Sequence, residues 1–316
     1  MGGNVVNESP DLDVDLSGLD PDEWTRRIDE IGEDEGYYQR IGDRHAALFI
    51  DAGPKLLVSF ENRATAMSNP FGRPRGFDMA TRENWSLLTI LADGDTWFRA
   101  PELYGYFDRL VDEAFLEDFD RVLFFGIHDA GYAAAAYSVT SPGASALLIR
   151  PVATLDPAIT PWERRFTSKR RLDFTTRYGY APDMVEALDK AHVVFDPTKA
   201  ADAMHAALYR GPNVSFYPTR QARPRIEALF DGIGITGDLL KAAMDDRLDP
   251  SRFAELWRRR RTSASYVRNL LKRVDMDDRP GLAARICAFG LTTPDAEFYR
   301  DRLAALGGAA SARAPA

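Results

Sequence analysis

The residues best arranged for chemistry lie in residues 121–138, the stretch RVLFFGIHDAGYAAAAYS. An apolar run predicts a short buried strand, Gly126 and Gly131 bracket a tight turn, and an alanine-rich run from Tyr132 predicts a helix. This is the frame of a nucleophile elbow, because small residues let strand and helix approach while the turn residue projects upward. In the pattern G-x-S-x-G the nucleophile position falls on His128. The frame therefore presents an imidazole where a serine would act.

Motifs for metals, nucleotides and redox chemistry are missing from the sequence. No two histidines are spaced i and i+4, no His/Cys/Asp cluster has metal-ligand spacing, and neither G-x-x-x-x-G-K-[ST] nor G-x-G-x-x-G after a strand occurs. We expect no metal site and no cofactor. A sulfonucleotide reductase needs a Cys-Gly-x-His context and a Ser-Gly-Gly loop, whereas the single cysteine, Cys287, is followed by AFG. That chemistry is not supported.

Length, composition and charge narrow the class of protein. A chain of 316 residues with 45% apolar residues can bury one large α/β domain, or a medium domain with an appendage. The formal net charge of −8 argues against wholesale nucleic-acid binding, which needs a basic surface. No run of 18 apolar residues occurs, and the start MGGNVVNESPDLDVD is acidic where a signal peptide is basic and then apolar. We expect no membrane span and a reduced, cytoplasmic setting.

Helix and strand signals alternate as far as residue 218. Asp20 as N-cap and Pro21 as first helical residue predict a helix whose buried face holds Trp24, Ile28 and Ile31. The runs ALFID and KLLVSFEN, separated by Gly-Pro, predict a hairpin. Further strands are predicted over residues 84–92, 121–125, 146–149, 191–195 and 213–217, and helices over residues 103–114, 183–190 and 200–209. Strands alternating with helices imply an α/β fold with a doubly wound, mostly parallel sheet.

The chain is predicted to contain four regions. These are an acidic leader and N-terminal helix over 1–38, an α/β domain over 39–221, a helical extension over 222–306 and a disordered tail over 307–316. Residues 1–18 show no apolar periodicity and are expected to be mobile. In the extension, helix starts are predicted at Asp249-Pro250 and Thr293-Pro294. Its basic residues, from Arg258 to Arg273, are expected to form a surface or partner-docking face.

The order LLVSF, NWSLLTILADGDTWF, YGYFDRLVDEAF, DRVLFFGIHDAGYAAAAYS and SALLIRPVATLD resembles α/β-hydrolase-like proteins encoded with bacterial surface-polysaccharide biosynthesis. The resemblance covers roughly residues 56–217. In such proteins the elbow reads like G-S-S-M-G-G-Y-A-A-L. The resemblance places Gly126, Gly131 and Tyr132 on the elbow frame and His128 at the position of serine. It implies a hydrolase-like fold with a degenerate elbow.

The resemblance also locates the other members of a catalytic triad. Asp196, after the run AHVVF, or Asp202 a turn later, stands where the acid belongs, although both are equally expected as cap residues. The base should be a histidine after the last strand. The chain has four histidines, namely His45, His128, His192 and His205. A triad in the family order cannot be assembled.

Two alternatives keep catalysis at the elbow. His128 could act as nucleophile or as general acid and base. Asp129 could be the nucleophile, as an elbow aspartate is in dehalogenase-like hydrolases, but this puts Ile127 in a small-residue position. We favour the interpretation that histidine replaced serine after catalysis was lost.

Basic and aromatic residues alternate over residues 162–180, WERRFTSKRRLDFTTRYGY, where such folds carry a cap over the mouth of the site. Arginines there could clamp a phosphate, sulfate or carboxylate, and aromatic rings could stack on a sugar or base. A solvated helix face is the equally weighted alternative. The ligand-binding residues predicted here are Gly126, Gly131, Tyr132, Arg164, Arg165 and Arg170.

The sequence thus favours a pseudoenzyme, an α/β-hydrolase-like protein without the Ser-His-Asp triad that binds an anionic glycan, nucleotide-sugar or acyl ligand. The first alternative is an active hydrolase or acyl transferase that uses His128 or Asp129, with Asp196 as acid. The second is a scaffold whose C-terminal helices bind a protein partner.

Overall fold

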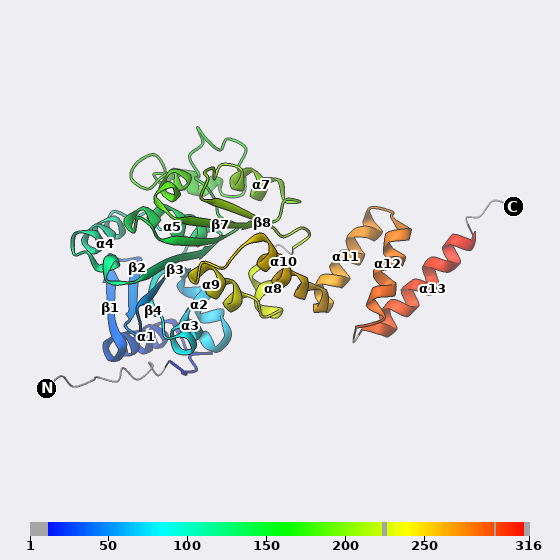
Figure 1. The fold of residues 1–316 in the computed structure, drawn as a ribbon, viewed down its shortest axis with the longest axis horizontal. Coiled ribbons are helices and arrows are strands. Elements are labelled where there is room, and N and C mark those ends of the chain that lie inside the picture. The colour runs from blue at the N-terminus through cyan, green and yellow to red at the C-terminus, as the bar shows by residue number, and fades with distance from the viewer. Residues whose placement is uncertain (1–11, 223–225, 294, 313–316) are drawn as a thin grey trace. The chain divides into compact units, whose positions relative to one another are not determined.

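The computed structural model describes residues 12–222, 226–293 and 295–312, which form two compact units (Figure 1). The first unit contains the described residues up to Pro218 together with Leu240–Asp249, and the second contains those of Thr219–Leu239 and from Pro250 onward. The sequence predicts one boundary near residue 221. The chain instead returns to the first unit for ten residues after the boundary has been crossed, and no shift in composition marks this return.

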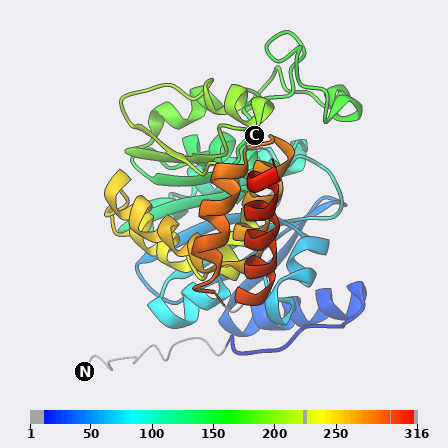
Figure 2. The same ribbon diagram turned by 90° about the vertical axis from the view of Figure 1, so that its right-hand side faces the viewer.

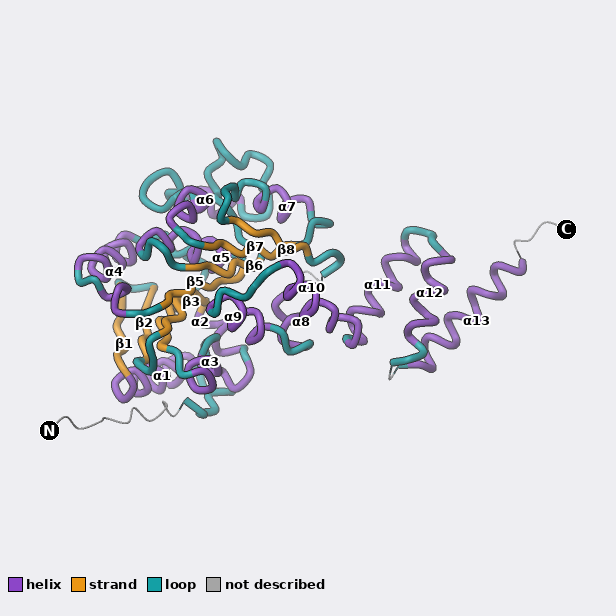
Figure 3. The backbone as a smooth tube through the Cα atoms, viewed as in Figure 1, coloured by secondary structure: helices purple, strands orange, loops and turns teal. Residues whose placement is uncertain are grey.

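A single eight-stranded sheet forms the centre of the first unit (Figure 3). The strands are β1 (Gly36–Ile41), β2 (His45–Ile50), β3 (Lys55–Asn62), β4 (Ser86–Ala92), β5 (Arg121–Ile127), β6 (Ser145–Ile149), β7 (Lys190–Phe195) and β8 (Val214–Pro218). Their order across the sheet is β1-β2-β4-β3-β5-β6-β7-β8. The pairs β1–β2 and β2–β4 are antiparallel, and the other pairs are parallel. The predicted α/β class and mostly parallel sheet are confirmed.

The predicted hairpin between the second and third strands is wrong. β4 lies between β2 and β3, and β2 forms its hairpin with β1 instead. Every residue of β2 is buried, as are the six central residues of β3. A continuous apolar run identifies a buried strand but carries no information on which strand is its neighbour. β1 was not predicted because its sequence, GYYQRI, is mostly half-exposed and mixes polar with apolar residues.

The first helix begins as predicted. The carboxylate of Asp20 accepts two of the free N–H groups of α1 (Pro21–Glu35), both at 3.0 Å. Trp24, Ile28 and Ile31 are buried on one face of this helix. Two local signals, the N-cap and the apolar stripe, were therefore sufficient to predict the position of α1.

Helices cover both faces of the sheet in the first unit. They are α2 (Arg63–Ser68), α3 (Phe77–Glu83), α4 (Pro101–Asp112), α5 (Asp129–Tyr137), α6 (Ala181–Met184) and α7 (Ala200–Ala206), with short 3₁₀ turns at Pro70–Gly72, Phe115–Asp118, Ser138–Thr140, Thr167–Arg171 and Val185–Ala187. In Figure 1, α4, α5 and α7 lie on one face, and α1 and α3 on the other. Every residue of α5 after Asp129 is buried, because its alanines let it lie close to the strands. Val111 is 48% exposed at the end of α4.

Two segments expected to lack structure are ordered in part. Leu12 and Leu16 are buried, and the N–H of Leu16 donates to the carbonyl of Phe71 at 2.7 Å. Residues 1–11 lie outside the described residues. Helix α13 (Ala296–Ala312) extends into the segment expected to be a disordered tail, of which residues 313–316 are outside the described residues.

The second unit is helical. It contains α8 (Ile226–Gly232), α10 (Pro250–Arg258), α11 (Ala264–Met276), α12 (Pro280–Gly290) and α13, a 3₁₀ turn at Arg259–Thr262, and the first residues of α9 (Thr236–Met244). The last three helices run in alternating directions (Figure 2). α10 begins at Pro250, as predicted, while residue 294 lies outside the described residues. Cys287 is a free cysteine buried on α12.

Candidate functional site

The turn between β5 and α5 has the geometry of a nucleophile elbow. His128 has φ 64° and ψ −113°, a strained backbone conformation for a residue with a side chain. Its N–H donates to the carbonyl of Ile149 at 2.8 Å, which ties the turn to β6. A Cβ on Gly126 would lie 2.0 Å from the carbonyl oxygen of Ala130, so only glycine permits this approach of strand and helix. The backbone presents His128 as the elbow of this fold presents its nucleophile.

Aromatic rings and one carboxylate surround the imidazole. The ring centroids of Phe166 and Trp97 lie 5.0 Å and 6.0 Å from that of His128. Nδ1 of His128 lies 3.3 Å from Oδ1 of Asp129, and both side chains are 28% exposed. Asp129 is the only carboxylate at ion-pair distance from His128 among the described residues. The imidazole thus packs against two aromatic rings and remains partly exposed.

The wall formed by Trp97 comes from a strained loop after β4. Trp97 and Phe98 both have φ 56°, and both are almost fully buried. The indole N–H of Trp97 is buried and has no hydrogen-bond partner within the described part of the chain. Tyr132, predicted on the elbow frame, packs beside this indole and donates its hydroxyl to the carbonyl of Tyr178 at 3.0 Å. Sequence reasoning missed Trp97, because its position after a strand is the only signal that marks it.

The two predicted acids serve the local backbone and a buried ion cluster. Asp196 is buried after β7, where its Oδ1 accepts the N–H of Thr198 at 2.9 Å and the hydroxyl of the same residue at 2.8 Å. Asp202 on α7 binds Arg150 at 3.0 Å and Arg165 at 2.5 Å. The structure therefore engages both carboxylates in holding the loops after β6 and β7.

A polar cluster formed by Glu163, His205, Asp202, Arg165 and Arg150 was not predicted, and we call it the buried polar cluster because the first three of these residues are buried. Nε2 of His205 lies 2.9 Å from Oε2 of Glu163, and both side chains are fully buried. Nδ1 of His205 accepts the N–H of Ala153 at 3.2 Å, so the imidazole carries its proton on Nε2 and donates it to the carboxylate. Burial lowers the pKa of His205, consistent with this neutral form. The members of the cluster are spread over residues 150–205, so no sequence spacing marks them.

Opposing effects act on the carboxylate at the centre of this cluster. Burial alone would raise the pKa of Glu163, but hydrogen bonds from His205 and Arg165 hold it well below its usual value. Arg165 donates to Glu163 through Nη2 at 2.6 Å and through Nε at 3.0 Å. Glu163 is therefore an ionised carboxylate that fastens the segment bearing Phe166.

The arginines predicted to clamp a ligand are distributed differently. Arg165 belongs to the buried polar cluster. Arg170 donates to the carbonyls of Thr160 and Glu163. Arg164 is exposed to solvent. Two of the three guanidiniums are thus engaged within the protein itself.

The hydrogen bonds of the remaining histidines do not involve the residues of the elbow. His45 is hydrogen-bonded through Nε2 to Oγ1 of Thr96 at 2.8 Å, and His192 through Nδ1 to the hydroxyl of Tyr217 at 2.9 Å. Burial lowers the pKa of both imidazoles to about 4. Each of the three histidines other than His128 is committed to a structural hydrogen bond.

The described residues contain neither a metal-binding group of side chains nor a membrane-spanning helix. Within residues 12–222, 226–293 and 295–312, no group of three His, Cys, Asp or Glu side chains is placed to hold a metal ion. No helix in the same ranges has the length and apolar character needed to cross a bilayer. Two cavities of the first unit, of about 350 and 680 Å³, are lined by residues other than those of the elbow.

Comparisons with known proteins find similarity in structure alone. No family model and no curated protein matches the sequence. An esterase of Pyrococcus furiosus, Pf2001, aligns with 66% of this chain and 91% of its own at 12% identity and a TM-score of 0.41. Est1E from Butyrivibrio proteoclasticus aligns with 66% and 98% at 11% identity and a TM-score of 0.43. The capsule O-acetyltransferase of Neisseria meningitidis serogroup A, solved with CoA, aligns with 63% and 91% at 14% identity and a TM-score of 0.40.

The architecture itself is clear from the strand order and the elbow. A mixed, mostly parallel eight-stranded sheet carries helices on both faces, and a sharp turn with a strained residue follows β5. The fold is therefore α/β-hydrolase-like, with additional helices at the C-terminal end.

Proposed function

We propose that this protein binds a ligand at its elbow without hydrolysing it. The observation that supports this most is the state of its histidines. His128 occupies the nucleophile position, while each of the other three histidines is buried and forms a hydrogen bond elsewhere in the protein. A serine-type relay needs a nucleophile and a separate base within hydrogen-bond reach, and losing either costs orders of magnitude in rate. Neither a hydroxyl nucleophile nor a second imidazole is available at this turn.

The surroundings of His128 suggest the chemistry of the ligand. Phe166 is half-buried and offers an apolar ring surface, which suits an acyl chain or the apolar face of a sugar. Trp97 is almost fully buried and packs behind this ring, with the two ring centroids 5.0 Å apart. Arg164 is an exposed cation two residues before Phe166 and can pair with an anionic end. The proposed ligand is therefore an acyl or glycosyl group with an anionic substituent, a nucleotide-sugar included.

Activity and binding can be tested separately on the full chain. A fluorophosphonate probe should leave the protein unlabelled, and hydrolysis of p-nitrophenyl acetate should equal that of the His128→Ala variant. UDP-glucose and octanoate are suitable probes for binding by thermal shift, and at least one of them should stabilise the wild type. Phe166→Leu should weaken that stabilisation, because it removes a ring from the wall. Ester turnover that disappears in His128→Ala would overturn the proposal.

One contact favours a second candidate, an active hydrolase or acyl transferase. Nδ1 of His128 lies 3.3 Å from Oδ1 of Asp129, so the carboxylate could orient the imidazole for acid-base work. In that case both Asp129→Asn and His128→Ala should lower kcat. Equal and negligible rates in all three proteins exclude this candidate.

The helical unit supports a third candidate, a docking surface for a protein partner. Met276 on α11 is 75% exposed and Phe298 on α13 is 46% exposed, and both line a cavity of about 390 Å³. The basic residues predicted to dock are partly paired, since Arg268 binds Asp295. Sedimentation of the full chain over a range of concentrations tests whether this surface mediates self-association, and Met276→Ser should abolish any complex found.

A further inference from the structure

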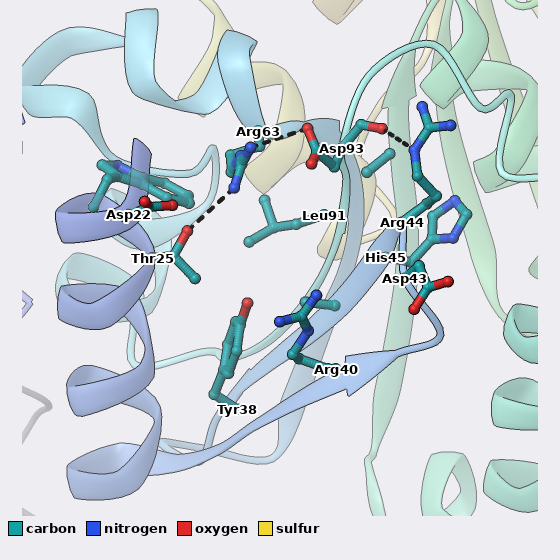
Figure 4. Close-up of a pocket in the computed structure, with 13 residues that line it drawn as sticks. Asp22, Thr25, Tyr38, Arg40, Asp43, Arg44, His45, Arg63, Leu91 and Asp93 are labelled. Atoms are coloured by element: carbon teal, nitrogen blue, oxygen red, sulfur yellow. Dashed lines mark hydrogen bonds and ion pairs between the residues drawn. The ribbon is translucent and has the colours of Figure 1, made fainter. Parts of the chain in front are cut away.

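We propose that a cavity between α1 and the β1–β2 hairpin binds the phosphate group of a small phosphomonoester. This site is separate from the elbow and does not depend on the function proposed there. The cavity has a volume of about 350 Å³ (Figure 4). Its cationic lining residues are Arg40, Arg44 and Arg63, and its apolar ones include Trp24, Ala46 and Leu91.

The strand register explains why a cavity exists here. Arg40 of β1 pairs with Ala46 of β2, which pairs in turn with Leu91 of β4, so the three side chains form one row across the sheet. Ala46 contributes only a methyl group to this row, which leaves room between its two larger neighbours. Tyr38, two residues before Arg40, points to the same face. The floor of the cavity is thus apolar and its β1 wall carries a guanidinium and a phenol.

The cavity is lined by three arginines and by three aspartates, Asp22, Asp43 and Asp93, but among the described residues only one of the arginines forms an ion pair. Arg40 is exposed, and no ion pair in the described part of the chain includes it. Arg63 binds Asp93 at 3.0 Å and donates to Oγ1 of Thr25 at 3.4 Å. Arg44 donates to the carbonyl oxygen of Asp93 at 2.7 Å, which leaves its charge without a carboxylate. Two of the three guanidiniums therefore carry charge that a bound anion can satisfy.

Carboxylates also line this cavity. Asp93 is already paired with Arg63, while Asp22 and Asp43 are exposed, as Arg40 and Arg44 are. Figure 4 shows Tyr38, Arg40, Arg63 and Leu91 around one space, with Asp43 on the far side of Arg40. An anion on the Tyr38 side of Arg40 lies away from Asp43.

The arrangement of donors favours a phosphate over a carboxylate. Arg40 and Tyr38 come from β1, and Arg63 comes from the start of α2 on the opposite side. Burial raises the pKa of Tyr38, so its hydroxyl stays protonated and can donate. Donors from two sides match the tetrahedral oxygens of a phosphate, whereas a planar carboxylate is satisfied by one guanidinium. The apolar floor then accommodates the organic part of an ester.

Calorimetric titration of the full chain tests this assignment. The probes are inorganic phosphate and phenyl phosphate, with chloride and acetate at matched ionic strength as controls, because screening alone can alter stability. Saturable binding of both phosphates is expected, with phenyl phosphate the tighter. Arg40→Gln should raise Kd at least about tenfold, as loss of a charge-assisted contact does. Ala46→Val should weaken binding by filling the cavity without altering charge.

A matched control separates this site from general electrostatics. Arg26 is an exposed arginine on α1, outside the cavity lining and paired with glutamates of its own helix. Arg26→Gln removes the same charge and should leave Kd unchanged. Equal affinity of the wild type and Arg40→Gln would overturn the proposal, as would acetate binding as well as phosphate or a phosphate effect no larger than that of chloride. None of these readouts involves the elbow, so their failure leaves the function proposed there unaffected.

Discussion

Phe166 lies edge-on to His128, with the two ring centroids 5.0 Å apart. Phe166 directly follows Arg165, whose guanidinium binds Glu163 and Asp202 in the buried polar cluster. The same guanidinium lies over the ring of Phe166, 5.1 Å from its centroid. The ion pairs of Arg165 therefore hold Phe166 in place over His128. Mutations can test the role of the ring and that of the ion pairs separately.

Phe166→Ala should expose the imidazole of His128. We expect diethyl pyrocarbonate to modify the variant several times faster than the wild type, and the signal is specific because the other three histidines are buried. The lost ring contacts should cost about 1–2 kcal/mol in the free energy of unfolding. Phe71→Ala is the control, since that ring is 55% exposed. An unchanged modification rate would show that Phe166 does not cover the imidazole.

Glu163→Ala should be strongly destabilising. It leaves the buried His205 without its acceptor and deprives Arg165 of one of its two carboxylate partners, the other being Asp202. Because Arg165 is 32% exposed and can recruit water, we expect a loss of about 2–4 kcal/mol rather than the full cost of a buried unpaired charge. Glu163→Gln should cost less, because the amide oxygen can still accept from His205. Urea unfolding checks this against exposed Glu186→Ala, and a loss under about 1 kcal/mol would contradict it.

Stability should fall on mild acidification. The pKa of His45 and that of His192 lie near 4 in the folded chain, against about 6.5 when unfolded. Between these values the unfolded chain binds protons that the folded chain excludes, so stability is complete above about pH 6.5 and declines toward pH 4. Each histidine should remove about 2 kcal/mol between about pH 6.5 and pH 5. Urea unfolding across this range should show a shallower slope in His192→Gln, and a flat profile in the wild type would refute the assignment.

Two glycine substitutions should have opposite effects. Gly126→Ala places a Cβ 2.0 Å from the carbonyl oxygen of Ala130 and should cost about 2–4 kcal/mol by forcing strand and helix apart. Gly105 lies within α4, where an added methyl group would meet no atom within 4 Å, so Gly105→Ala should gain about 0.5–1 kcal/mol from helix propensity. Thermal unfolding measures both. Equal midpoints for Gly126→Ala and the wild type would mean that the elbow does not require the close approach of β5 and α5.

Local signals in the sequence were sufficient for several elements. The cap at Asp20 predicted the start of α1, and the glycines of the elbow predicted a turn that the structure confirms with His128 at positive φ. In both cases the information lies within a few adjacent residues, where backbone sterics and capping act.

Relationships between distant segments could not be predicted in the same way. The insertion of β4 between β2 and β3 depends on which apolar strands pack best in three dimensions, not on either sequence alone. Pairing of Glu163 with His205 brings together residues 42 positions apart, which no periodicity encodes. The carboxylate and carbonyl partners that Arg165 and Arg170 have within the protein could not be predicted, because composition carries no information on such contacts.

The strained loop after β4 has a mechanical consequence. Asp93 is held by Arg63 and Arg44 at the cavity beside α1, and four residues later Trp97 stands against the imidazole of His128. Trp97 and Phe98 both have a left-handed backbone conformation, which restricts how far this loop can adjust when either of its ends is displaced. A ligand in the cavity beside α1 that displaces this loop therefore changes the free energy of binding at the elbow. By thermodynamic linkage, a ligand at the elbow changes the free energy of binding in the cavity by the same amount.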